Sequence, residues 1–204
     1  MPAESGPCSS EKKGYVLRRF GKEGTAFDVT YPQLTGHKDE AVRKRVNDAI
    51  RKEAREWQCH GGAGGEHQTF TVETTVVRLD EQVFSYKLVF DYFCGGPYPD
   101  AHVEARTYDL ESGKLVQTED LFKPGFDNAA IAKLILESGP LDPECKEAYE
   151  KASTFSFFLV DRSIVLFPSL PHVVQACASE HAFAISHLRE HLRPGTLLTR
   201  GESH

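Results

Sequence analysis

The sequence predicts one α+β domain, an antiparallel sheet with helices packed on one face. The expected elements run as strands, one helix, strands, two helices and strands, which is not the regular strand–helix alternation of a parallel sheet. The chain has 204 residues, of which 40% are hydrophobic and 26% charged, as in ordinary globular domains. That length suits a single domain. We expect it to span residues 13–195, between tails at 1–12 and 196–204.

Two strands are expected at the beginning of the chain. Residues 1–12 are polar and contain Pro, Gly and Ser, so they are predicted to form a tail without regular structure. Residues 14–20 have the composition of a strand. Over residues 25–31, apolar side chains alternate with polar ones, which predicts a second strand. Pro32 is expected to end that strand because it lacks a backbone N–H.

One long amphipathic helix is expected over residues 39–57, with Asp39 as its N-cap. A glycine-rich stretch at 60–67 follows it. A phosphate-binding loop would lie between a strand and the start of a helix, whereas this stretch follows a helix and precedes a strand, so we interpret it as a linker. The apolar residues that recur at helical spacing are Val42, Val46, Ala49, Ile50, Ala54 and Trp57.

The middle of the chain predicts a run of antiparallel strands. Residues 68–79 and 82–93 are joined by a short connection at 80–81, which is typical of a hairpin. A third strand is expected over 102–110, and the chain resumes as a strand at 115–116 after a turn. The second of these strands carries large side chains at alternate positions, namely Phe84, Tyr86, Leu88, Phe90 and Tyr92.

The C-terminal part predicts two helices and then more strands. Amphipathic patterns indicate helices over residues 128–138 and 143–151. Residues 155–160 and 163–167 are apolar runs around a two-residue turn, so they predict a second hairpin. A last strand is expected over residues 182–186, leading into a short closing segment.

Charge and hydropathy exclude two classes of partner. The formal net charge is −6 and no block of Lys and Arg stands out, so we expect no nucleic-acid partner. No stretch approaches the roughly 18 consecutive apolar residues that span a bilayer. The first residues lack the apolar segment of a signal peptide, which leaves a cytosolic protein or one whose leader has been removed.

The cysteines bear on that choice. None forms a CxxC or a His/Cys cluster with metal-ligand spacing, so no metal site is expected. Four lie in the expected domain and one in the N-terminal tail, which fits two disulfides and a spare thiol in an exported protein; five reduced thiols are the alternative. Cys59 with Cys94 is the favoured pair, because each closes a regular element beside a glycine-rich loop. The five residues are Cys8, Cys59, Cys94, Cys145 and Cys177.

No pattern indicates a catalytic centre. His187 and His191 have the spacing of a helical metal pair, but the nearby acid is Glu190, whereas the zinc-protease motif needs its Glu directly after the first His. The chain also has no G-x-S-x-G nucleophile motif. We therefore predict no catalytic residues, no metal and no cofactor, in a protein that is not an enzyme.

Two weaker hydrolase hypotheses stay open. Cys94 lies beside Gly95-Gly96, and His102 could serve as its base. Alternatively, Asp91, Asp100 and Glu104 could supply a pair of catalytic carboxylates.

Three ordered groups of segments resemble a known family. The first combines residues 31–36 (Tyr-Pro-Gln-Leu-Thr-Gly) with Asn47 in the predicted helix. The second comprises residues 90–96, which end in Cys-Gly-Gly, residues 106–114 and residues 119–122. The third comprises residues 157–167 and 185–188. Over residues 15–193 the chain resembles the extracytoplasmic domain shared by the anti-sigma factor RsiV and the N-terminal part of the peptidoglycan deacetylase PdaC.

The resemblance implies a binding function outside the cytoplasm. In that family the domain of RsiV binds lysozyme and triggers a stress response, and the catalysis of PdaC lies in a separate domain. We therefore expect a periplasmic or secreted protein whose partner is a lysozyme-like cell-wall hydrolase or peptidoglycan. Membrane contact is expected only through a lipid anchor or leader outside this chain. The alternative within the same mode of binding is an immunity protein that neutralises a bacterial toxin.

Partner contacts are expected on the loops, at residues 61–65, at 169–178 and above all at 95–102. The family commonly has Gly-Gly-Ala-His at the last of these turns, whereas this chain inserts Pro-Tyr-Pro-Asp between the glycines and Ala-His. Exposed aromatic residues are frequent energetic centres of interfaces. The residues predicted to contact the partner are Gly95, Gly96, Tyr98, Asp100 and His102.

Overall fold

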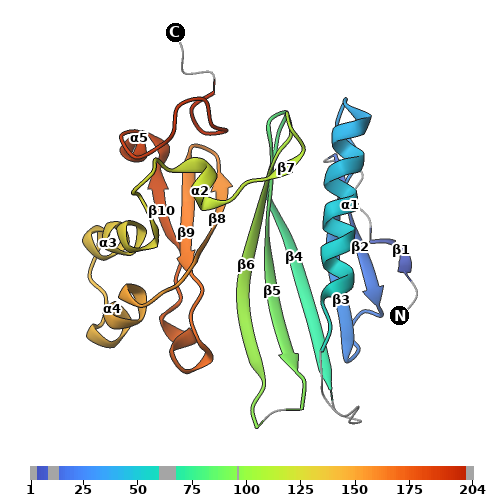
Figure 1. The fold of residues 1–204 in the computed structure, drawn as a ribbon. Helices are drawn as coiled ribbons and strands as arrows, with labels where there is room; N and C mark the ends of the chain where they lie inside the picture. Colours follow the sequence, from blue (N-terminus) through green and yellow to red (C-terminus); the bar gives the residue numbers. More distant parts are fainter. Residues whose placement is uncertain (1–3, 9–13, 60–67, 96, 201–204) are drawn as a thin grey trace.

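The computed structural model describes residues 4–8, 14–59, 68–95 and 97–200. A seven-stranded sheet forms the larger part of the fold and a three-stranded sheet forms the smaller part. Helix α1 (Glu40–Glu56) covers one face of the larger sheet, and most of the other helices lie beyond the smaller sheet (Figure 1). The four layers are therefore helix, sheet, sheet and helices, and the predicted α+β class is confirmed.

The larger sheet follows the order of the chain. Strands β3 and β4 are parallel neighbours joined through α1, and the other neighbours are antiparallel. This sheet is therefore mixed rather than purely antiparallel. Its strands are β1 (Glu4–Cys8), β2 (Tyr15–Gly21), β3 (Phe27–Leu34), β4 (Thr69–Leu79), β5 (Val83–Phe93), β6 (Asp100–Asp109) and β7 (Lys114–Leu115).

Helix α1 begins and packs as its sequence predicts. The Asp39 side chain accepts hydrogen bonds from the backbone N–H groups of Ala41 and Val42, at 2.8 and 3.1 Å. These bonds satisfy donors that would otherwise lack a partner at the helix start. The predicted apolar face is buried against the large side chains of β5, except that Ala49 is exposed and Trp57 is only half-buried. The buried residues of α1 are Val42, Val46, Ile50 and Ala54.

Asn47 ties α1 to the end of β3. Its Oδ1 accepts a hydrogen bond from the backbone N–H of Leu34 at 2.8 Å, and its Nδ2 donates to the Leu34 carbonyl oxygen at 2.9 Å. Both backbone groups lie on the side of β3 away from β2, and β4 does not extend that far along β3. The side-chain amide therefore takes the place of a neighbouring strand.

We expect Asn47→Ala to lower the free energy of unfolding by about 2 kcal/mol, since each of the two lost hydrogen bonds contributes roughly 1 kcal/mol. Urea denaturation of the two variants measures the effect. Asp48→Ala is the matched control, because Asp48 makes only an exposed ion pair with Lys44 and should change the stability by less than about 0.5 kcal/mol. Equal effects of the two substitutions would contradict the role of Asn47.

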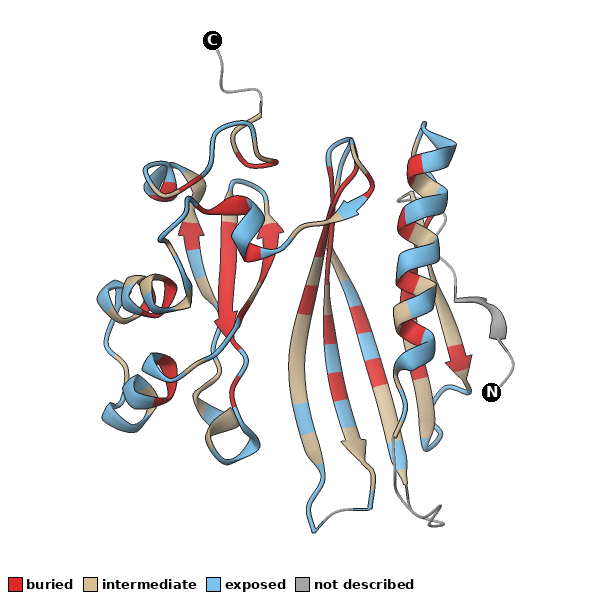
Figure 2. Ribbon diagram, in the orientation of Figure 1, coloured by how far each residue is buried: buried red, intermediate tan, exposed pale blue. Residues whose placement is uncertain are grey.

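The C-terminal hairpin forms a sheet of its own, in the antiparallel order β10-β9-β8. Phe157 and Leu159 face the helices, whereas Phe158 and Val165 face the larger sheet. Strand β9 is buried along almost its whole length (Figure 2). Because both faces are apolar, this sheet is a middle layer, and the expectation of one sheet with helices on one face is corrected.

The elements of this C-terminal part follow one another closely. They are α2 (Thr118–Leu121), α3 (Asn128–Ser138), α4 (Pro143–Glu150), β8 (Phe155–Val160), β9 (Ser163–Pro168), the 3-10 helix η2 (His172–Cys177), β10 (His181–Ala184) and α5 (Ile185–Leu188). Helix α2 and η2 have no counterpart in the prediction, because each is too short for a periodic pattern. No helix within the described ranges is long and apolar enough to cross a membrane.

Strand β3 continues through Pro32 to Leu34, so the prediction that Pro32 ends it is wrong. Pro32 pairs with Leu17 of β2, while β4 runs beside β3 only from Phe27 to Val29. One side of β3 is thus unpaired at Pro32, and its missing N–H costs no ladder hydrogen bond.

Ordered structure also extends into both expected tails, as a strand in the first and as packed turns in the second. Residues Glu4–Cys8 form β1, which pairs with β2. At the other end Leu197 and Leu198 are buried in the core, and Arg200 binds Asp109 through Nη2–Oδ2 and Nη1–Oδ1 contacts of 2.8 and 3.0 Å. The expected boundary at residue 195 is therefore too early.

Candidate functional site

Two disulfides lie at two of the three segments predicted to contact a partner, 95–102 and 169–178. Cys59–Cys94 joins the segment after α1 to the end of β5, which confirms the favoured pair, and Cys145–Cys177 joins α4 to η2. Their Cα atoms are 5.3 and 5.2 Å apart. Paired disulfides are typical of proteins outside the cytoplasm.

The loop between β5 and β6 presents an aromatic side chain to solvent. Gly95 has a φ of +93°, in the left-handed region that favours glycine. Tyr98 is 73% exposed, so its ring is accessible to a partner. Gly96 and the predicted contact loop at 61–65 lie outside the described residues.

Asp100 brings the two predicted loops together. Its Oδ1 lies 2.9 Å from Nδ1 of His172 in η2, and its Oδ2 accepts a hydrogen bond from the Tyr92 hydroxyl at 3.0 Å. Burial alone would raise the pKa of Asp100, but the hydrogen bonds from His172, Tyr92 and the Ala101 N–H outweigh it and lower the pKa. The contact residues expected at 95–102 and at 169–178 are therefore neighbours in space.

His102 lies on the same face of β6 as Asp100. Its ring stacks on Phe90, with 4.5 Å between ring centroids and 8° between planes, and Tyr92 meets it edge-on. The His102 Nε2 is 3.3 Å from Oε1 of Glu104. The ring is thereby held between an aromatic partner and a carboxylate.

Arg106 continues this polar row and joins it to α1. Its Nη2 lies 2.5 Å from Oε1 of Glu53 and 2.5 Å from Oε2 of Glu104. Burial would lower the pKa of Arg106, but Glu53 and Glu104 raise it overall. Burial would likewise raise the pKa of Glu104, yet hydrogen bonds and charge from His102 and Arg106 lower it.

The base of η2 is held by a buried phenol. The Tyr149 hydroxyl lies 2.9 Å from Ser179 Oγ and 2.8 Å from His181 Nε2. Ser179 and His181 are themselves 3.0 Å apart. Burial lowers the pKa of His181, which favours the neutral form of its ring. Together with Cys145–Cys177, this cluster positions η2.

The residues of the two hydrolase hypotheses do not converge. The sulfur of Cys94 is bonded to Cys59, so it is not a thiolate nucleophile. Asp91 pairs with Ala101 and therefore faces the opposite side of the sheet from Asp100 and Glu104. Within the described ranges, no group of three His, Cys, Asp or Glu is placed to hold a metal ion.

Tyr98 in the β5–β6 loop and Val173 in η2 are both strongly exposed apolar side chains. Among the described residues, the large hydrophobic side chains that are exposed are Val89 (37%), Tyr98 (73%) and Val173 (87%). Val89, Gln175 of η2 and residues 178–180 line part of a cavity of about 260 Å³ between the sheets. The sequence analysis named Tyr98 itself, but covered Val173 and His172 only as part of the expected contact segment 169–178.

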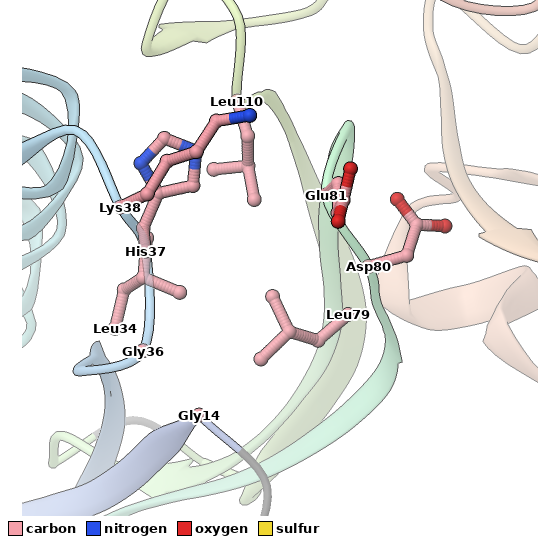
Figure 3. A pocket seen from close by; sticks show the side chains of 9 residues that line it. All are labelled: Gly14, Leu34, Gly36, His37, Lys38, Leu79, Asp80, Glu81 and Leu110. Carbon is pink, nitrogen blue, oxygen red and sulfur yellow. The ribbon is translucent and has the colours of Figure 1, made fainter.

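A second cavity, of about 290 Å³, lies at the opposite end of β5. Figure 3 shows His37 and Lys38 above Leu34 on one side, Asp80 and Glu81 above Leu79 on the other, and Leu110 at the top. The Asp80 carboxylate accepts hydrogen bonds from Arg78 and from the Gln82 and Val83 N–H groups, so it closes the β4–β5 turn. None of the residues predicted for partner contact lines this cavity.

The comparisons with known proteins give the fold. No family model and no curated protein matches the sequence. Among solved structures, a DUF3298 family member from Bacteroides fragilis is similar, with a TM-score of 0.66, 12% identity, and coverage of 93% of this chain and 97% of that one. A DUF3298 family protein from Pseudomonas aeruginosa has a TM-score of 0.57 and 12% identity, with 95% of each chain covered. The chain therefore has the fold of solved DUF3298 domains.

Proposed function

We propose that this protein is a non-catalytic, extracytoplasmic binding domain. Its binding surface is the end of the molecule formed by the β5–β6 loop and η2, here called the loop end. The observation that carries the proposal is that each of the two segments bears a strongly exposed apolar side chain, Tyr98 and Val173, and that the Asp100–His172 contact joins the segments. Exposed apolar residues grouped in this way, with polar residues around them, mark interaction surfaces.

The loop end is preorganised for binding. Cys94 is four positions before the exposed Tyr98, and Cys177 is four positions after the exposed Val173. The Asp100–His172 contact joins the two loops between these disulfides. Loops that are already ordered lose less conformational entropy when they bind.

The partner that we propose is a lysozyme-like cell-wall hydrolase, with peptidoglycan itself as the second choice. The support comes from the resemblance of residues 15–193 to the RsiV and PdaC domain. Two disulfides support a place of action outside the cytoplasm. A chain with a net charge of −6 also suits a basic protein partner.

We expect Tyr98→Ala and Val173→Ala each to weaken the binding of a lysozyme-type muramidase about tenfold, since truncated interface centres commonly cost about 1.4 kcal/mol or more. Isothermal titration calorimetry measures the dissociation constants. Glu81→Gln, at the opposite end of β5, is the control and should leave the affinity unchanged.

Two results would count against the proposal. Wild-type affinity in both alanine variants would remove the loop end as the contact surface. A wild-type protein that binds neither muramidases nor peptidoglycan would remove the proposed class of partner.

A further inference from the structure

Strand β6 has a free edge along most of its length. Strand β7 pairs only with Tyr108 and Asp109, and the Val116 N–H donates to the Thr107 carbonyl oxygen at 2.8 Å. Before Thr107, no strand of the described chain is hydrogen-bonded to the side of β6 away from β5, although β8 packs nearby. An open strand edge is a template for another strand.

The Thr107 hydrogen bond shows which backbone groups of β6 point outward at this edge. Because strand residues alternate, the N–H and C=O groups of Ala105, Val103 and Ala101 also point away from β5. Two side chains occupy part of the edge. Arg106 Nη1 donates to the Ala105 carbonyl oxygen at 2.9 Å, and the Ala101 N–H donates to Asp100 at 2.9 Å. The N–H and C=O of Val103 and the N–H of Ala105 have no partner among the residues that the structure places.

Two cavities follow one another beside this edge. The cavity of about 260 Å³ is lined by residues 101–103 of β6, and one of about 350 Å³ is lined by residues 104–106. On the facing wall, Phe167 and Pro168 line the first cavity and Ser169 lines the second. The six residues of β6 make a trough about 20 Å long, at roughly 3.3 Å per residue.

The two cavities differ in chemistry. The first is walled by the apolar side chains of Val89, Val103, Phe167 and Pro168. The second has the carboxylates of Glu53 and Glu104 at its wall, against the single guanidinium of Arg106. An apolar side chain suits the first cavity and a basic side chain suits the second.

We propose that this trough binds an extended peptide segment of a partner protein by strand addition to β6. Only a peptide backbone offers N–H and C=O groups at the spacing that Val103 and Ala105 require. The segment places an apolar side chain in the first cavity and a Lys or Arg side chain beside Glu53 and Glu104. The inference rests on the proposed function, because the trough begins next to Asp100, the residue that joins the two segments of the loop end.

The test uses peptides selected from a phage-displayed library of random sequences against the disulfide-bonded protein. Val103→Pro removes the outward N–H of Val103 and no hydrogen bond to β5, so the sheet tolerates it. We expect Val103→Pro to weaken the binding of the selected peptides at least tenfold. Val103→Ala also loses the valine side chain but keeps the backbone N–H, so it should retain most of the affinity. Circular dichroism and thermal unfolding establish that both variants fold.

A second measurement does not depend on any variant. Hydrogen exchange followed by NMR on the wild-type protein should slow at the Val103 and Ala105 amides when the peptide binds. Peptides that bind Val103→Pro and Val103→Ala equally, or that leave these amides unprotected, would overturn strand addition. A selection that yields no peptide would do the same.

The proposed function fails by a different result. Muramidase and peptidoglycan binding depend on Tyr98 and Val173, which the peptide test does not alter. Edge-dependent peptide binding without muramidase or peptidoglycan binding would support strand addition and remove the proposed class of partner. Muramidase binding that is lost in Tyr98→Ala but unchanged in Val103→Pro would support the loop end and overturn strand addition.

Discussion

Replacing Cys59 and Cys94 together by alanine is expected to lower the free energy of unfolding by about 4 kcal/mol, because the disulfide closes a long loop in the unfolded chain. The two cysteines are 35 residues apart in the sequence. The Cys145–Cys177 bond, with a separation of 32, should contribute about as much. Losing both bonds approaches the whole stability of a typical domain, about 5–15 kcal/mol.

Urea denaturation of each double variant measures this effect. Cys8→Ser is the control, because Cys8 takes part in neither bond, and it should leave the midpoint unchanged. The wild-type protein should also lose stability when a reductant is added, whereas a variant that lacks all four bonded cysteines should not respond. A wild-type midpoint that is the same with and without reductant would contradict the prediction.

Arg106→Ala is expected to lower the free energy of unfolding by about 3 kcal/mol at neutral pH, since removing one member of a largely buried ion pair leaves uncompensated charge. Here Glu53 and Glu104 would face each other across the space that Arg106 fills. Their side chains are 23% and 32% exposed, so water screens part of the repulsion. We therefore place the effect at the lower end of the usual range.

The pH dependence of this variant has a definite sign. In the wild-type protein the pKa of Glu104 is lowered, so its contribution to stability is present above the unfolded pKa and is lost as the pH falls through the folded one. Without Arg106 the two carboxylates repel each other, and protonation relieves the repulsion. The stability difference between the two proteins should thus be large at pH 7 and small near pH 4.

Urea unfolding of the wild type, Arg106→Ala and Arg106→Lys at both pH values tests this account. Lysine keeps the charge but not the forked geometry, so its variant should fall between the other two. A difference between wild type and Arg106→Ala that is the same at pH 7 and pH 4 would show that charge is not the cause.

Much of the fold could be predicted because its signals are short-range. Asp39 caps α1 and Val42 lies on its buried face, as the local pattern indicates. Asn47 and residues 31–36 formed one group of the family resemblance, and in the structure Asn47 binds Leu34 at the end of β3. The Cys59–Cys94 pair followed from the position of each cysteine at the end of an element.

The candidate site could be predicted only in part. Tyr98 was recognised because loop aromatics next to glycine and proline are expected to be exposed. The partner of Asp100 was missed, since His172 is 72 positions away and lies in a short 3-10 helix that no periodic pattern reveals. The pairing of Cys145 with Cys177 stayed open for the same reason, because it depends on where α4 and η2 pack.

The sequence by itself determined the longer elements of this protein, the N-cap of α1 and its apolar face, because these depend on residues a few positions apart. Only the tertiary structure decided that the last hairpin forms a separate sheet, that Asp100 meets His172 and that the edge of β6 stays open. These features arise from the packing of whole faces against one another. An apolar pattern in the sequence shows that a face will be buried, but it does not show which other face will cover it.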